Sequence, residues 1–89
     1  MTFNIANKRI TIIGLQKSGV AAAQLASMNG AHVFVSDLIE NEITKKNYQE
    51  LTENNINCEI GKHTDRIFES DLWVISPGVP KNIKIIKKL

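Results

Sequence analysis

The sequence predicts an α/β fold, a doubly wound parallel sheet of about four strands with helices between them. Short apolar runs rich in β-branched residues alternate along the chain with longer segments whose apolar residues follow helical spacing. The first of these runs ends in a glycine-bounded turn that opens a helix. Strands and helices that alternate at this spacing form right-handed crossovers, and such crossovers build a parallel sheet.

The first strand-helix unit opens the chain. Residues 9–13 form a short apolar, β-branched run, which is typical of a central strand buried on both faces. Gly14 and Gly19 bound the loop that follows. We expect Ser18 to cap the N-terminus of the helix and Gly30 to end it. The side of this helix expected to face the core carries Val20, Ala23, Leu25 and Ala26.

The second unit repeats the pattern. Residues 31–37 form a β-branched run that ends in an acid, and a helix is expected from Asn41 onward. Polar residues separate its apolar positions, which are Ile43, Tyr48 and Leu51. A second crossover therefore follows the first.

The last third of the chain holds two shorter strands. We predict a third strand over residues 56–61, a helical turn over 63–70 and a fourth strand over 71–76. The sequence SPGVP, residues 76–80, is expected to make a rigid turn at the end of a central strand. Residues 81–89 begin another helical pattern. The whole chain is expected to be a single domain that stops before a fifth strand.

The composition is that of a soluble globular protein. A net charge of +2 is too small to argue for nucleic acid or an anionic membrane, and 43% of the residues are hydrophobic. Cys58 is the only cysteine, so no internal disulfide is possible, and no cysteines or histidines stand at metal-ligand spacing. There is no secretory signal pattern and no apolar run of membrane-spanning length. We therefore expect a cytoplasmic protein.

A ligand site is predicted where the parallel strands end. Ligands of open α/β sheets bind beyond the carboxyl ends of the strands, and the N-terminus of the first helix favours an anion there. Four segments converge on this edge: the loop from Gly14 to Gly19, Asp37, the segment from Gly61 to His63, and the turn from Ser76 to Pro80. Phosphate is the expected ligand group.

Gln16 bears on which nucleotide would fit. The dinucleotide pattern G-x-G-x-x-G has glycine at this position, because a side chain there obstructs the pyrophosphate. Asp37 nevertheless lies about as far downstream as the acid that reads an adenosine ribose. An NAD-type domain therefore stays open as an alternative, as does a loop in which Gly14 and Gly19 serve only the turn and the packing. No phosphate loop for ATP and no nucleophile motif is present.

Single side chains in this region also have two interpretations. Lys17 could supply charge to a phosphate or be an ordinary exposed lysine. Ser18 could offer its hydroxyl and its N–H to a ligand or only cap the helix. His63 could be a general base or have a structural or peripheral role. It has no nucleophile or paired carboxylate near it in the sequence, so we interpret it as structural or peripheral.

Three segments of the chain resemble the N-terminal, Rossmann-like domain of the Mur ligases. They read KRITIIGLQKSGVAAAQLASMNGAHVFVSD, EIGKH and DLWVISPGVP, and together they cover nearly the whole chain. The loop G-L-x-x-[ST]-G combined with SPG[IV] after the fourth strand is fairly specific to one member. That resemblance implies that residues 1–89 are the UDP-binding domain of a three-domain enzyme, which uses ATP to add D-glutamate to UDP-N-acetylmuramoyl-L-alanine in peptidoglycan synthesis.

The resemblance also implies roles for single residues. Lys17 and Ser18 match loop positions that contact the diphosphate. Asp37, Leu38 and Ile39 match the uracil-binding end of the second strand, and Gly78 matches the turn that lines the uridine site. Many relatives have glycine at position 16, so Gln16 is a departure.

Further expectations concern the whole protein. ATP and Mg²⁺ would bind the missing central domain, so that no catalytic residue and no cofactor is expected in these residues and the chain alone would be inactive. A sheet edge left without its fifth strand could pair with a second copy.

Overall fold

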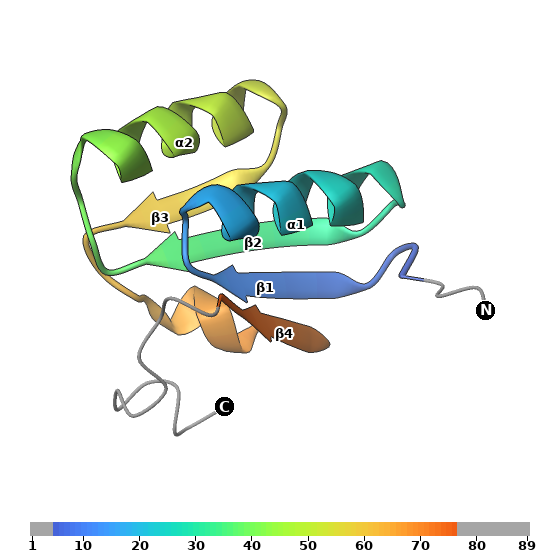
Figure 1. Cartoon of the computed structure of the whole chain (residues 1–89). Helices are drawn as coiled ribbons and strands as arrows, with labels where there is room; N and C mark the ends of the chain where they lie inside the picture. Colours follow the sequence, from blue (N-terminus) through green and yellow to red (C-terminus); the bar gives the residue numbers. More distant parts are fainter. Residues whose placement is uncertain (1–4, 77–89) are drawn as a thin grey trace.

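The computed structural model describes residues 5–76 and shows one parallel sheet flanked by helices (Figure 1). Its strands are β1 (Arg9–Ile13), β2 (His32–Asp37), β3 (Asn57–Ile60) and β4 (Leu72–Ile75). Its helices are α1 (Lys17–Met28), α2 (Glu42–Glu53) and the short 3-10 helix η1 (Asp65–Phe68). The strands lie in the order β3-β2-β1-β4, and all neighbours are parallel. The predicted α/β class and parallel sheet are confirmed.

The strand order reverses direction beside β1. The chain first adds β2 and β3 on one side of β1 and then returns to add β4 on the other side. In the register, Ile10 pairs with Val33 of β2 and with Leu72 of β4. A crevice at such a reversal is where open α/β sheets bind ligands. The carboxyl ends of β1 and β4 are therefore the place to look for a site.

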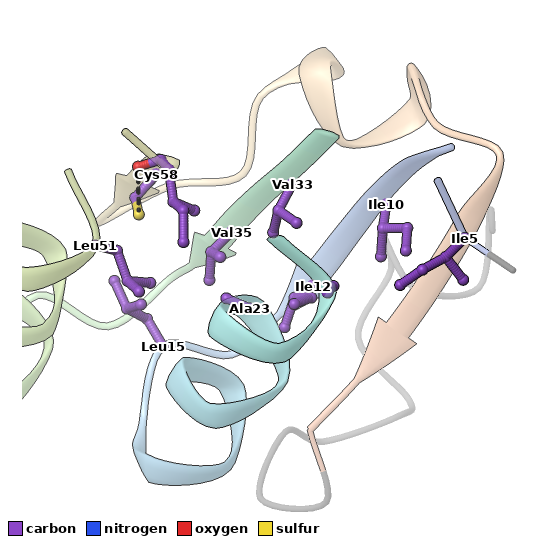
Figure 2. Close-up of a cluster of buried hydrophobic side chains, with 11 residues drawn as sticks. Ile5, Ile10, Ile12, Leu15, Ala23, Val33, Val35, Leu51 and Cys58 are labelled. Atoms are coloured by element: carbon purple, nitrogen blue, oxygen red, sulfur yellow. Dashed lines mark hydrogen bonds between the residues drawn. The ribbon is translucent and has the colours of Figure 1, made fainter. Parts of the chain in front are cut away.

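The larger core lies between the sheet and the two long helices. Alternate residues of β1 and β2 point to this face, and Figure 2 shows Ile12, Val33 and Val35 beside Ala23 of α1. Burial raises the pKa of the Cys58 thiol in this core to about 11. The full cluster consists of Ile5, Ile10, Ile12, Leu15, Ala23, Ala26, Val33, Val35, Leu51, Ile56 and Cys58.

The opposite face of the sheet has a smaller core. Ile13, Phe34 and Ile67 of η1 pack together there. The indole N–H of Trp73 donates to the carbonyl of Ile67 over 2.6 Å, and the guanidinium carbon of Arg66 lies 4.3 Å from the centre of the Phe34 ring. The helical turn predicted over residues 63–70 is thus the element that covers this face (Figure 1).

The predicted helix details need correction. Helix α1 begins at Lys17 with Gln16 as its N-cap residue, so Ser18 lies inside the helix and does not cap it. The predicted inner side is also partly wrong, since Leu25 is 63% exposed and Ile43 of α2 is 60% exposed. Gly19 of α1 and Thr44 of α2 are buried instead.

The position of β4 is a further correction. Within the described residues β4 pairs only with β1 and forms an edge of the sheet, not a central strand. Leu72, Trp73 and Val74 are accordingly 37–42% exposed. The turn predicted beyond Ser76 and the helical tail after it lie outside the described residues. No helix among residues 5–76 is long and apolar enough to cross a membrane.

Candidate functional site

The loop between β1 and α1 needs glycine at both ends. Gly14 has φ 116°, which a side chain disfavours, and its N–H donates to the carbonyl of Ser36 over 2.8 Å. At Gly19 an added Cβ would lie 1.9 Å from the carbonyl oxygen of Gly14. Glycine at position 19 therefore lets the first turn of α1 lie directly against the end of β1.

Gln16 has a backbone conformation that any residue can adopt. Its φ of −113° and ψ of −167° are extended, so the fold of the loop does not require glycine there. The side chain is exposed and accepts no capping hydrogen bond. The missing middle glycine is thus compatible with the loop, and its consequence falls on the ligand that the loop can accept.

The N-terminus of α1 is left open, in contrast to that of α2. Helix α2 begins with a capping box between Asn41 and Thr44 and has Glu42 in its first turn. Helix α1 has no side-chain cap and no acidic residue in its first turn, so no group of the helix itself offsets the positive end of its dipole. An anion could accept hydrogen bonds from these first N–H groups.

A cavity of about 480 Å³ lies at this open helix end. It is lined by Gln16, Lys17, Ser18, Ala21 and Ser76. Ser76 follows β4, and its Oγ lies 2.8 Å from Oγ of Ser18. The cavity is therefore at the carboxyl ends of β1 and β4, where the strand order reverses. Lys17 is exposed and forms no ion pair within residues 5–76, so its charge is available there.

Asp37 is buried and holds two backbone segments together. Its Oδ2 accepts from the N–H of Leu15 over 2.7 Å, and its Oδ1 accepts from the N–H of Ile39 over 2.8 Å. The side chain is only 6% exposed, and both of its oxygens accept from backbone N–H groups. Because this acid shapes the loop, its position in the sequence is not by itself a sign of a dinucleotide site.

Leu38 and Ile39 follow Asp37 and are each 49% exposed. Large apolar side chains in water are available to pack against a ligand, although single ones are common on protein surfaces. The structure thus brings the predicted residues Gln16, Lys17 and Ser18 together around the cavity, and ties Asp37 to the same loop. Gly78 lies outside the described residues.

A polar network beside Asp37 was not predicted. Oγ of Ser36 lies 2.6 Å from Glu59 Oε2 and 2.6 Å from His63 Nδ1. Thr64 donates its hydroxyl to Glu59 Oε1 and its N–H to Glu59 Oε2. The sequence signal was the acid inside the short apolar run NCEI, since a buried carboxylate needs donors. These contacts give His63 a structural role, in agreement with the structural or peripheral role predicted for it.

Both titratable groups of this network have shifted pKa values. Burial raises the pKa of Glu59, but hydrogen bonds from Ser36 and Thr64 outweigh it and leave that pKa below its ordinary value of 4.5. Burial also lowers the pKa of His63 below 6.5, against the opposing charges of Glu59 and Asp37. No group of three or more potential metal ligands occurs in residues 5–76.

Comparison with known proteins identifies the family. The family model described as the MurD N-terminal domain matches residues 9–85. The chain belongs to the MurD N-terminal domain family. Among curated relatives, the UDP-N-acetylmuramoylalanine–D-glutamate ligase of Chloroherpeton thalassium is 44% identical to the chain over 87 residues, with 96% of the chain and 18% of the relative covered. The ligase of the same name from Geobacter sp. strain M21 is 42% identical over 81 residues, which cover 90% of the chain and 18% of the relative.

The chain spans about a fifth of the length of these relatives. A solved structure, the bacillithiol disulfide reductase Bdr from Bacillus cereus, matches with a TM-score of 0.50 and 23% identity. The match covers 66% of the chain and 20% of the reductase. At this identity the likeness concerns the fold alone, an α/β fold with a parallel sheet.

Proposed function

We propose that residues 1–89 are one UDP-binding domain, which holds the UDP part of UDP-N-acetylmuramoyl-L-alanine for a D-glutamate-adding ligase. The observation that carries the proposal is the uncapped N-terminus of α1 beside a cavity lined by Lys17, Ser18 and Ser76. Family membership supports the choice of ligand, because the relatives are named as ligases of a UDP-linked substrate.

The diphosphate would lie against the first turn of α1. The free N–H groups there donate to phosphate oxygens, and the helix dipole favours the negative charge. Lys17 adds a positive charge from the cavity wall. The hydroxyl of Ser18, now paired with Ser76, can rotate to donate to a phosphate while Ser76 keeps contact with it.

The uracil would lie near the end of β2. Leu38 and Ile39 offer apolar surface to the base, and Asp37 holds the backbone of Ile39 in place through its Oδ1. Gly78, which lies outside the described residues, would contact the uridine. Gln16, which lines the cavity, would cover the diphosphate.

The chemistry of the ligase would belong to the part of the relatives that this chain does not span. ATP and Mg²⁺ would bind there, and ATP would activate the substrate carboxylate as an acyl phosphate for attack by the D-glutamate amine. We place this step in cytoplasmic peptidoglycan synthesis. The 89-residue chain would bind the nucleotide and would be inactive as a ligase by itself.

Calorimetric titration of the chain with UDP, uridine and NADH tests this function. We expect UDP to bind more tightly than uridine, because only UDP uses the open helix end. Lys17→Ala should weaken UDP binding by about five- to tenfold, in keeping with one lost charged hydrogen bond, and leave uridine binding unchanged. Lys8→Ala is the matched control. Lys8 is exposed just before the amino end of β1, whereas the proposed site lies at the carboxyl end of that strand. Tighter binding of NADH than of UDP would refute the proposal.

A further inference from the structure

The network at the carboxyl ends of β2 and β3 fixes the tautomer of His63. Ser36 is fully buried, and its Oγ touches both a carboxylate oxygen of Glu59 and Nδ1 of His63. A hydroxyl has one proton, and an ionised carboxylate can only accept. Ser36 therefore donates to Glu59 and accepts from His63, so that neutral His63 carries its proton on Nδ1.

The same network closes the turn after β3. Glu59 accepts two hydrogen bonds from Thr64, of 2.6 and 2.8 Å, and the N–H of Gly61 donates to the carbonyl of Asp37 over 2.9 Å. His63 is thus held between the end of β2 and the start of η1. The charged groups that act on its ring are Glu59 from β3 and Asp37 from β2, and burial keeps the ring neutral at neutral pH.

The end of β2 in turn holds the glycine loop. The carbonyl of Ser36 accepts the N–H of Gly14 over 2.8 Å, and Asp37 Oδ2 accepts the N–H of Leu15 over 2.7 Å. Residues 36 and 37 therefore contact the loop on one side and the network on the other. A change in the network can move the loop without any contact between His63 and a ligand.

We propose that His63 is a positioning residue for the nucleotide site. Its Nδ1–H fixes the hydroxyl of Ser36, and the end of β2 held in this way fixes Gly14 and Leu15 at the start of the loop that would bind the diphosphate. The ligand named here rests on the proposed function, whereas the link between His63 and the loop rests on the contacts alone.

Three variants of the chain test the link. His63→Leu removes the donor to Ser36, whereas His63→Asn can place an amide N–H near the position of Nδ1. The control is His32→Leu, because His32 is the only other histidine and is exposed at the start of β2, away from the loop. The measurements are amide hydrogen exchange at Gly14 and Leu15 without ligand, UDP affinity, and the imidazole ¹⁵N spectrum of the unmodified chain.

We expect the spectrum to show the Nδ1–H tautomer of His63. His63→Leu should speed exchange at both amides and weaken UDP binding, each by about tenfold, the factor for one lost hydrogen bond. His63→Asn should bring both the exchange rates and the UDP affinity most of the way back to those of the unmodified chain. His32→Leu should change neither quantity. Unchanged exchange in His63→Leu, or an Nε2–H tautomer in the unmodified chain, would overturn the proposal. The tautomer is measured on the unmodified chain, so it tests the proposal even if a variant fails to fold. Absence of UDP binding with the expected exchange pattern would refute only the proposed function.

Discussion

Asp37 illustrates how far a single residue can be interpreted from sequence. Asp37 is the last residue of β2, so the structure confirms its predicted place at the carboxyl ends of the strands, whereas its contact with a ligand stays a prediction. Its burial could not be predicted. The sequence shows the same acid at the end of a strand whether its carboxylate faces a ligand or accepts from two backbone N–H groups. The same ambiguity hid Ser36 and Glu59, whose contacts join segments more than twenty residues apart.

Asp37→Ala should destabilise the fold as well as reduce UDP binding. The substitution leaves the N–H groups of Leu15 and Ile39 without their acceptor, which costs about 3 kcal/mol of the free energy of unfolding. Urea unfolding followed by circular dichroism measures this loss. Asp71→Ala is the control, because Asp71 is exposed and its carboxylate pairs with Arg9 at the start of β1. Equal stability of the two variants would show that Asp37 does not hold the loop.

Acid should weaken the fold in two steps. The pKa of His63 is lowered by burial, so the unfolded chain takes up a proton first and the free energy of unfolding falls as the pH drops below 6.5. The pKa of Glu59 is also lowered, since the hydrogen bonds from Ser36 and Thr64 outweigh burial, so its stabilisation is lost below pH 4.5. Urea unfolding at pH 8, 6, 5 and 4 measures both steps. In His63→Asn the loss of stability below pH 6.5 should disappear. If it persists, another group is responsible for it.

At the scale of elements, the sequence predicted which segments form and missed how their ends are used. Asn41 marks the start of α2 correctly because its side chain caps the helix. Ser18 does not mark the start of α1, because the tight turn after Gly14 lets the helix begin at Lys17 without a cap. A helix N-terminus without a cap is not marked by any residue type. Its free N–H groups could therefore be recognised only in the folded structure.

The edge strand β4 is where we predict self-association. Its side chains Leu72, Trp73 and Val74 are partly exposed, and its outer backbone groups have no strand partner within residues 5–76. Val74→Lys should reduce concentration-dependent dimerisation by at least about fivefold, since a charged edge opposes pairing. Sedimentation velocity measures this. Leu25→Lys, at an even more exposed apolar site on α1, should leave dimerisation unchanged, and equal effects of both substitutions would exclude the β4 edge.

At the scale of the whole molecule, the alternation of strands and helices was enough to predict the sheet. Right-handed crossovers leave few arrangements for such a chain, and the observed order β3-β2-β1-β4 is one of them. The order puts the open end of α1 at the reversal beside β4. The cavity there is lined by Gln16, Lys17, Ser18, Ala21 and Ser76. Local patterns could not show that Ser18 meets Ser76, because that contact depends on the packing of the entire sheet.

Chemical-shift mapping of the ¹⁵N-labelled chain during titration with UDP tests directly whether UDP binds at the open end of α1. We expect the largest shifts on the amides at the carboxyl ends of the strands, which are those of Gln16, Lys17, Ser18, Leu38, Ile39 and Ser76. Two results would contradict binding at this site. One is shifts concentrated at the amino ends of the strands, on Arg9, His32 and Asn57, and the other is no shifts at saturating UDP.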